Sequence, residues 1–186
     1  MSFFIKILSV FAIGCSFGWV LEVLFRRFWS GNGAKHRWIN PGFLKGPWLP
    51  VYGIGLSALY IFCEILFPLM PNSIIFTALG LLTLSSLLTE IEYLSGLVSK
   101  RLFHVVLWDY SGEWGNVDGI ICPLFSVFWS LLALGYYFFV HKPLEGLVGR
   151  LVINPLFSGI LGIYLIAFFL DFLISINRTL SARKEF

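Results

Sequence analysis

The chain has 186 residues, of which 58% are hydrophobic and only 12% are charged, and its formal net charge is +3. A soluble domain carries roughly a quarter charged residues, so this composition predicts a protein that uses lipid as its solvent. The small net charge and the lack of a contiguous basic stripe argue against nucleic-acid binding, which needs clustered Lys and Arg side chains.

Five segments are apolar over the roughly 20 residues that a membrane-spanning helix requires. They predict an all-α fold, a polytopic membrane helical bundle in which residues 1–186 form a single integral membrane domain. The predicted spans cover residues 3–25, 48–70, 73–98, 120–140 and 151–176.

The distribution of basic residues between the predicted loops sets the expected orientation, because cytoplasmic loops are enriched in Lys and Arg. Ten of the 13 Lys and Arg residues fall on one side of the five spans, namely Arg26, Arg27, Lys35, Arg37, Lys45, Lys100, Arg101, Arg178, Arg183 and Lys184. The sequence therefore predicts a multi-pass protein of the cell membrane with its N-terminus outside and its C-terminus in the cytoplasm.

The first predicted span carries a carboxylate on a stripe of glycines. Gly14, Gly18 and Glu22 recur every four residues and share one helix face, and the GxxxG spacing of the glycines allows a close helix approach. Two interpretations stay open. The stripe is either a packing seam whose acid pairs with Arg26, one turn further on, or a face that delivers the carboxylate into a shared cavity.

The third predicted span is the most polar one. Ser85, Thr89, Glu92 and Gly96 follow one continuous helix face, whereas Glu90 lies two positions from Glu92 and so points elsewhere. We therefore expect Glu92 to face the interior of the bundle.

Two further acids lie within predicted spans. Asp171 is near the cytoplasmic end of the fifth span, where a helix C-terminus disfavours negative charge, so we expect a basic partner such as Arg178, Lys45 or Arg26. Glu64 is nearer the outer side, is interpreted as interfacial, and is not assigned to the site.

Two polar loops occupy the predicted cytoplasmic side. The first, residues 40–53, is rich in residues that fix or bend the backbone and is interpreted as a pocket-lining loop rather than a plain connector. These structural positions are Pro41, Gly42, Gly46, Pro47, Pro50 and Gly53, and Lys45 lies among them.

The second loop, residues 108–119, places aromatic side chains among carboxylates and contains Asp109, Tyr110, Ser111 and Asn116. Asp109 is expected either to cap the following helix or to accept a hydrogen bond from Lys45. Since Glu22, Glu92 and Asp171 lie level with both loops, we expect one functional site on the cytoplasmic side.

No metal site and no disulfide are expected, because Cys15, Cys63 and Cys122 are an odd number of cysteines without metal-ligand spacing. The chain has no GxxxxGK[ST], HExxH, GxSxG or CxxC motif. No catalytic residue and no cofactor are therefore assigned.

Several motifs taken together are specific. They are Gly18-Trp19-x-x-Glu22, the run from Asn40 to Gly53 that includes Phe43, Glu92-Tyr93-x-x-Gly96, Trp108-Asp109-Tyr110-Ser111, Asn116, Gly119-Ile120-Ile121-Cys122 and Phe125-Ser126-x-x-Trp129. They cover about residues 14 to 130 and resemble the ABC-transporter type IV family, also described as CmpB-like permeases. The resemblance implies a permease component.

Three functions remain as hypotheses. The first is a transporter permease component whose cytoplasm-facing polar cavity binds a small polar or charged solute through Glu22, Lys45, Glu92, Asp109, Tyr110, Ser111, Asn116 and Asp171. Five helices are few for a complete transporter, which implies a homodimer or a partner that is an ATPase or another membrane subunit. The alternatives are a membrane-embedded enzyme or lipid-binding protein, and a structural or assembly protein whose polar groups fasten its helices.

Overall fold

The computed structural model describes residues 2–28, 40–42 and 44–182, which are mainly helical apart from the two polar loops. Within these residues, the only β pairing is an isolated bridge between Val117 and Ile121. Of the ten basic residues used to predict the orientation, four lie outside the described residues: Lys35, Arg37, Arg183 and Lys184. Phe43 of the first loop also lies outside them.

Five helical stretches are long and apolar enough to span a membrane, which confirms the predicted helical membrane fold. The first is α1 (Ser2–Phe28), and the second joins α2 (Pro50–Ile61), η1 (Phe62–Leu66) and η2 (Phe67–Leu69). The third joins α3 (Ile74–Val98) and η3 (Ser99–Phe103), the fourth joins α4 (Pro123–Gly135), η4 (Tyr136–Val140) and α5 (His141–Leu151), and the fifth is α6 (Pro155–Ala182).

The fourth span differs most from its predicted bounds, because the helix continues past residue 140 to Leu151. The prediction ends this span at residue 140 because the sequence becomes polar at His141. In the structure, the backbone remains helical through this polar sequence. As a result the fifth span begins at Pro155, four residues after its predicted start.

Prolines explain several helix starts and two irregular turns. Pro50, Pro123 and Pro155 open α2, α4 and α6, where a missing N–H costs nothing. The π-helical turns η1 and η4 precede Pro68 and Pro143, which lack the N–H that the preceding turn would otherwise use.

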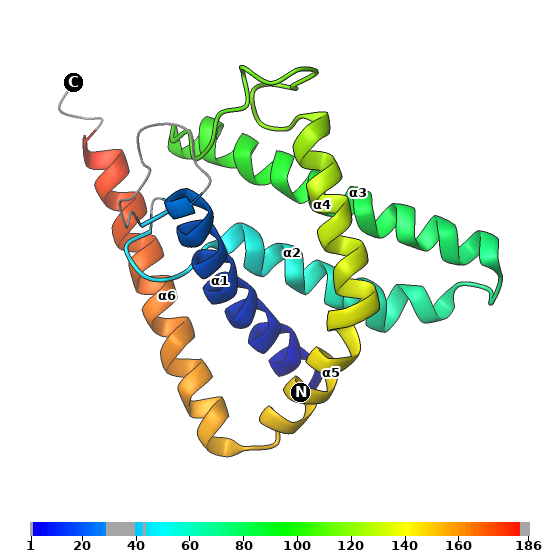
Figure 1. The fold of residues 1–186 in the computed structure, drawn as a ribbon. Coiled ribbons are helices and arrows are strands. Elements are labelled where there is room, and N and C mark those ends of the chain that lie inside the picture. The colour runs from blue at the N-terminus through cyan, green and yellow to red at the C-terminus, as the bar shows by residue number, and fades with distance from the viewer. Residues whose placement is uncertain (1, 29–39, 43, 183–186) are drawn as a thin grey trace.

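The helices pack in two neighbouring sets (Figure 1). α1 packs mainly against α2 and also contacts α6, while α3 packs against α4 and also contacts α2. The buried core joins these sets and includes Val10, Tyr60, Leu84, Ala133 and Val148, which come from α1, α2, α3, α4 and α5.

The two polar loops lie at one end of the bundle, together with the C-terminal end of α6 (Figure 1). Basic residues occur in the helix ends that adjoin these loops: Arg26 is in the last turn of α1, Lys100 and Arg101 are in η3, and Arg178 is near the end of α6. This clustering supports the predicted placement of both loops on one side of the membrane.

Candidate functional site

A cavity of about 280 Å³ lies where the two loops meet the helices. Its walls come from the C-terminal halves of α1 and α3, the first loop, the start of α2, the loop after η3, α4 and α6. Its polar and aromatic lining residues include Glu22, Arg26, Tyr52, Glu92, Ser95, Ser99, Phe103, Trp108, Tyr110, Trp129 and Phe172.

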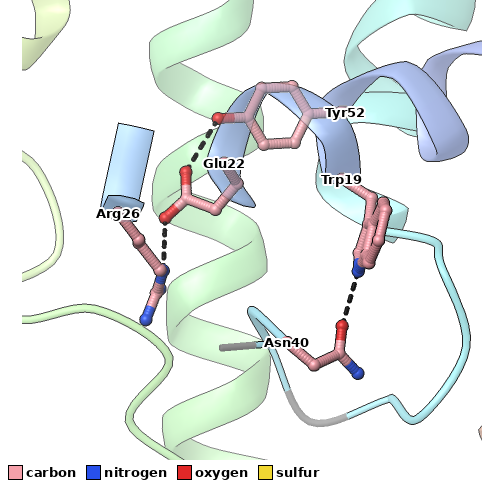
Figure 2. A network of polar contacts seen from close by, with 5 residues as sticks. All are labelled: Trp19, Glu22, Arg26, Asn40 and Tyr52. Atoms are coloured by element: carbon pink, nitrogen blue, oxygen red, sulfur yellow. Dashed lines mark hydrogen bonds and ion pairs between the residues drawn. The ribbon is translucent and has the colours of Figure 1, made fainter. Parts of the chain in front are cut away.

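Glu22 lies between two partners in the wall of this cavity. Its Oε1 accepts a hydrogen bond from Arg26 Nε at 2.9 Å, and its Oε2 accepts one from the Tyr52 hydroxyl at 3.3 Å (Figure 2). The Arg26 pair is the one expected from the i,i+4 spacing. Glu22 therefore belongs both to a fastened helix pair and to the cavity lining.

The glycine stripe explains why Tyr52 reaches Glu22. A Cβ atom on Gly18 would lie 2.2 Å from Tyr52 Cγ, and one on Gly14 would lie 2.8 Å from the Tyr52 carbonyl oxygen. Only glycine at these positions lets α1 and α2 approach so closely, which confirms the predicted packing role of the GxxxG motif.

Glu92 is the most enclosed acid of the site, with 2% of its surface exposed, whereas Glu90 is exposed. The Tyr110 hydroxyl donates to Glu92 Oε1 at 3.1 Å. The Trp129 side chain also interacts with this carboxylate, but Oε2 is buried without a hydrogen bond of normal geometry. Glu92 thus faces the interior as expected and keeps one oxygen unsatisfied.

Tyr110 joins the second loop to α3 and α4. Its ring stacks on Phe125 with centroids 4.3 Å apart and an interplanar angle of 8°. Burial, together with the charge of Glu92, raises the pKa of Tyr110 above its ordinary value, so its hydroxyl remains a donor.

The other residues predicted in the second loop do not line the cavity. Asp109 Oδ1 accepts from the backbone N–H of Ser111 at 2.9 Å, and this bond lowers the pKa of Asp109. Asn116 Nδ2 donates to the carbonyl oxygens of Ser111 at 3.2 Å and Glu113 at 2.9 Å. Their short polar side chains bond to the local backbone, so they shape the loop instead of entering the cavity.

Asp171 and Lys45 meet in a way that differs from the expected ion pair. Asp171 Oδ2 accepts from the backbone N–H groups of Lys45 at 3.0 Å and Gly46 at 2.9 Å, and from Trp48 Nε1 at 2.8 Å. Within the described residues, no ion pair of Asp171 is formed, and Lys45 contributes its backbone while its side chain is exposed. Three N–H donors satisfy the carboxylate, so it does not need a basic partner.

The first loop forms part of the cavity wall, which favours the pocket interpretation over a plain connector. Pro41, Gly42, Leu44, Leu49 and Pro50 line the cavity. Gly42 has a φ of 80°, a backbone conformation that favours glycine. Asn40 Nδ2 donates to the carbonyl oxygens of Leu44 and Lys45 at 2.9 Å, and Asn40 Oδ1 accepts from the Trp19 indole (Figure 2).

The remaining positions predicted to shape the first loop are Gly46, Pro47 and Gly53, and the two glycines lie in close contacts. A Cβ atom on Gly53 would lie 2.4 Å from Cys15 Sγ, and one on Gly46 would lie 2.1 Å from Trp48 Cζ2. Pro47 is exposed between Gly46 and Trp48. Glycine at positions 46 and 53 is therefore required by close contacts in the described structure.

A second polar group lies away from the cavity and was not predicted from the sequence. His141 Nε2 lies 3.1 Å from Glu64 Oε1, and His141 Nδ1 lies 3.0 Å from the Tyr136 hydroxyl. Glu64 is therefore paired and not merely interfacial. The available sequence signal was the spacing of Tyr136 and His141, five residues apart.

The comparisons with known proteins give one match. A family model described as Putative ABC-transporter type IV matches residues 9–176. No curated protein and no solved structure matches the chain.

Proposed function

Because the chain belongs to the family described as Putative ABC-transporter type IV, we propose that it is a transporter permease component that binds a small polar or charged solute in the cavity between Glu22 and Glu92. Family membership and the five span-like helices support a membrane transporter component. The part that we propose beyond this is that the solute is small and polar or charged, and that it binds in this cavity.

The observation that carries the proposal is the unsatisfied oxygen of Glu92. An ionisable group within a membrane span is costly and normally serves a pathway or a binding site. Glu92 is buried at the cavity wall with its Oε2 unbonded, so an incoming solute could complete its hydrogen bonding. A purely structural acid would be expected to have both oxygens satisfied.

In this proposal the cavity opens toward the cytoplasmic side of the cell membrane. This assignment rests on the predicted orientation, in which the basic loops are cytoplasmic. Residues 1–186 contain no P-loop motif, so they do not themselves form the ATPase that this proposal includes as a partner. A homodimer would supply additional spanning helices and is the alternative assembly.

The test compares cells that carry the wild-type protein, Glu22→Gln, Glu92→Gln or Glu90→Gln. Glu90→Gln is the matched control, because it removes the same charge from an exposed position in α3. We expect the two cavity variants to change the intracellular solute profile, measured by mass spectrometry, while the control resembles wild type. Unchanged profiles for both cavity variants at equal protein levels would contradict transport through this cavity.

Purification from native membranes, followed by mass spectrometry, tests the assembly. A stoichiometric ATPase or membrane subunit would support a permease. A bound lipid without any protein partner would favour the alternative of a lipid-binding protein or membrane enzyme, for which the largely apolar cavity wall is suited.

A further inference from the structure

The charges of the cavity do not balance. Among the described residues that line it, the charged side chains are Glu22, Arg26 and Glu92. Arg26 already forms a 2.9 Å ion pair with Glu22. Glu92 Oε1 accepts a hydrogen bond from Tyr110 and the Trp129 side chain lies near the carboxylate, but no described residue forms an ion pair with Glu92. Within the described residues, the cavity therefore presents one carboxylate without a countercharge.

This imbalance disfavours an anionic ligand and favours a donor or a cation. An anion would place a second negative charge near Glu92 in a setting of low polarity, where like charges repel strongly. A ligand that carries an N–H donor would instead bond the free Oε2 of Glu92, the atom that lacks a hydrogen bond.

The remaining walls suit an organic cation better than a metal ion. Tyr52, Trp108, Tyr110 and Trp129 line the cavity with aromatic rings, and such rings attract ammonium groups. Hard metal ions need several oxygen ligands, and the Glu22 oxygens are already bonded to Arg26 and Tyr52. The volume of about 280 Å³ is appropriate for a small molecule.

We propose that the solute class of this cavity is a small amine with a single positive charge, whose ammonium group binds Glu92 Oε2 while its apolar part lies against Tyr110 and Trp129. This assignment rests on the proposed function of the cavity as a solute site. It adds that the solute is positively charged and that Glu92 is its primary contact.

The experiment uses the full chain in nanodiscs of zwitterionic lipid, with empty nanodiscs as the blank. Three probes of similar shape are titrated by calorimetry: benzylammonium, benzyl alcohol and benzoate. We expect benzylammonium to bind at least about tenfold more tightly than benzyl alcohol, and benzoate to bind most weakly, because only the cation complements a buried carboxylate.

Variants then assign the preference to Glu92. Glu92→Gln should reduce the preference for benzylammonium to less than about threefold, and Glu90→Gln should leave it unchanged. Comparison of the three probes on the wild-type protein needs no variant, so the test holds even if Glu92→Gln folds poorly. Equal affinity for the three probes, binding of none of them, or a preference retained in Glu92→Gln would overturn the assignment.

The outcomes also separate this inference from the proposed function. If all three probes bind equally and Trp129→Leu weakens them all, the cavity is a solute site without a preference for cations. If benzylammonium binds through Glu92 but the Glu92→Gln cells keep a wild-type solute profile, the amine site stands and the transport function fails.

Discussion

The carboxylate of Asp171 in α6 accepts a hydrogen bond from the indole N–H of Trp48 at 2.8 Å, across 123 positions of sequence. The same oxygen accepts the backbone N–H groups of Lys45 and Gly46. These bonds fasten the first loop to the last span, and this loop supplies Leu44 and Leu49 to the cavity wall. α6 thus contributes to the site mainly by holding a loop.

Replacing Asp171 with Asn should loosen this loop. An Asn side chain carries no charge, so its carbonyl oxygen accepts the three N–H groups more weakly than the carboxylate does, and we expect a loss of about 1–3 kcal/mol in the free energy of unfolding. Hydrogen exchange should become faster at residues 44–49, whereas the Glu90→Gln control should match wild type. Unchanged exchange at these residues would show that other contacts hold the loop.

The contact between α1 and α2 predicts a strong effect for Gly18→Ala. The added Cβ atom would lie 2.2 Å from Tyr52 Cγ, so the ring must move and withdraw its hydroxyl from Glu22. We expect a destabilisation of about 1–3 kcal/mol, measured by denaturant unfolding in mixed micelles. Gly159→Ala is the matched control, because a Cβ atom there meets nothing within 4 Å. Similar stabilities for the two variants would contradict the close approach.

Tyr110 predicts a specific dependence of stability on pH. Its pKa is raised above the ordinary 10.0 by burial and by Glu92, so above pH 10 the unfolded chain loses this proton while the folded chain keeps it. The stability that Tyr110 contributes is therefore complete below pH 10 and is lost as the pH rises.

Tyr110→Phe removes this contribution. At neutral pH the variant should lose about 1–3 kcal/mol, because Glu92 Oε1 loses its donor. Between pH 9 and about pH 11, unfolding curves should show a shallower decline for the variant than for wild type. Parallel curves would mean that Tyr110 titrates normally in the folded protein.

The pair of His141 and Glu64 predicts a structural role at the other end of the bundle. His141→Leu would leave both Glu64 Oε1 and the Tyr136 hydroxyl without this partner, at a cost of about 1–3 kcal/mol for each group. Thermal unfolding should show a lower midpoint for His141→Leu, while Lys142→Gln, with a side chain 79% exposed, should leave it unchanged. Equal midpoints for His141→Leu and the wild-type protein would show that the His141–Glu64 pair does not stabilise the fold.

The orientation predicted from the basic residues can be tested with reporter fusions. A green fluorescent protein fused after the C-terminus should fluoresce, because this end is expected in the cytoplasm, and an alkaline phosphatase at the same place should be inactive. Fusions made after Asn72, between the second and third spans, should give the opposite pair of results. The reverse pattern would place the cavity on the outer side.

Much of the fold is accessible from sequence because the bilayer imposes a simple requirement on each segment by itself. Hydrophobic length identified the five spans, and the face shared by Ser85, Glu92 and Gly96 identified the buried acid of α3. The spacing of Gly14 and Gly18 likewise indicated a close helix contact. These are properties of neighbouring residues along one helix.

The partners of the polar groups required the tertiary structure. Sequence spacing found the local partner of Glu22, but it assigned Asp171 a basic side chain when the carboxylate instead accepts three N–H groups from a distant loop. It also grouped Asp109, Ser111 and Asn116 with the cavity, although the side chains of Asp109 and Asn116 bond to the backbone of Ser111 within the loop.

The sequence by itself determined that this protein belongs in a membrane and which helix faces are polar, since hydrophobicity and helical period are local properties. Only the tertiary structure decided that Glu22 and Glu92 share one cavity and that Glu64 pairs with His141. The physical reason is that a buried polar group takes whichever donor the packing brings within hydrogen-bonding distance, and that distance depends on the arrangement of the helices.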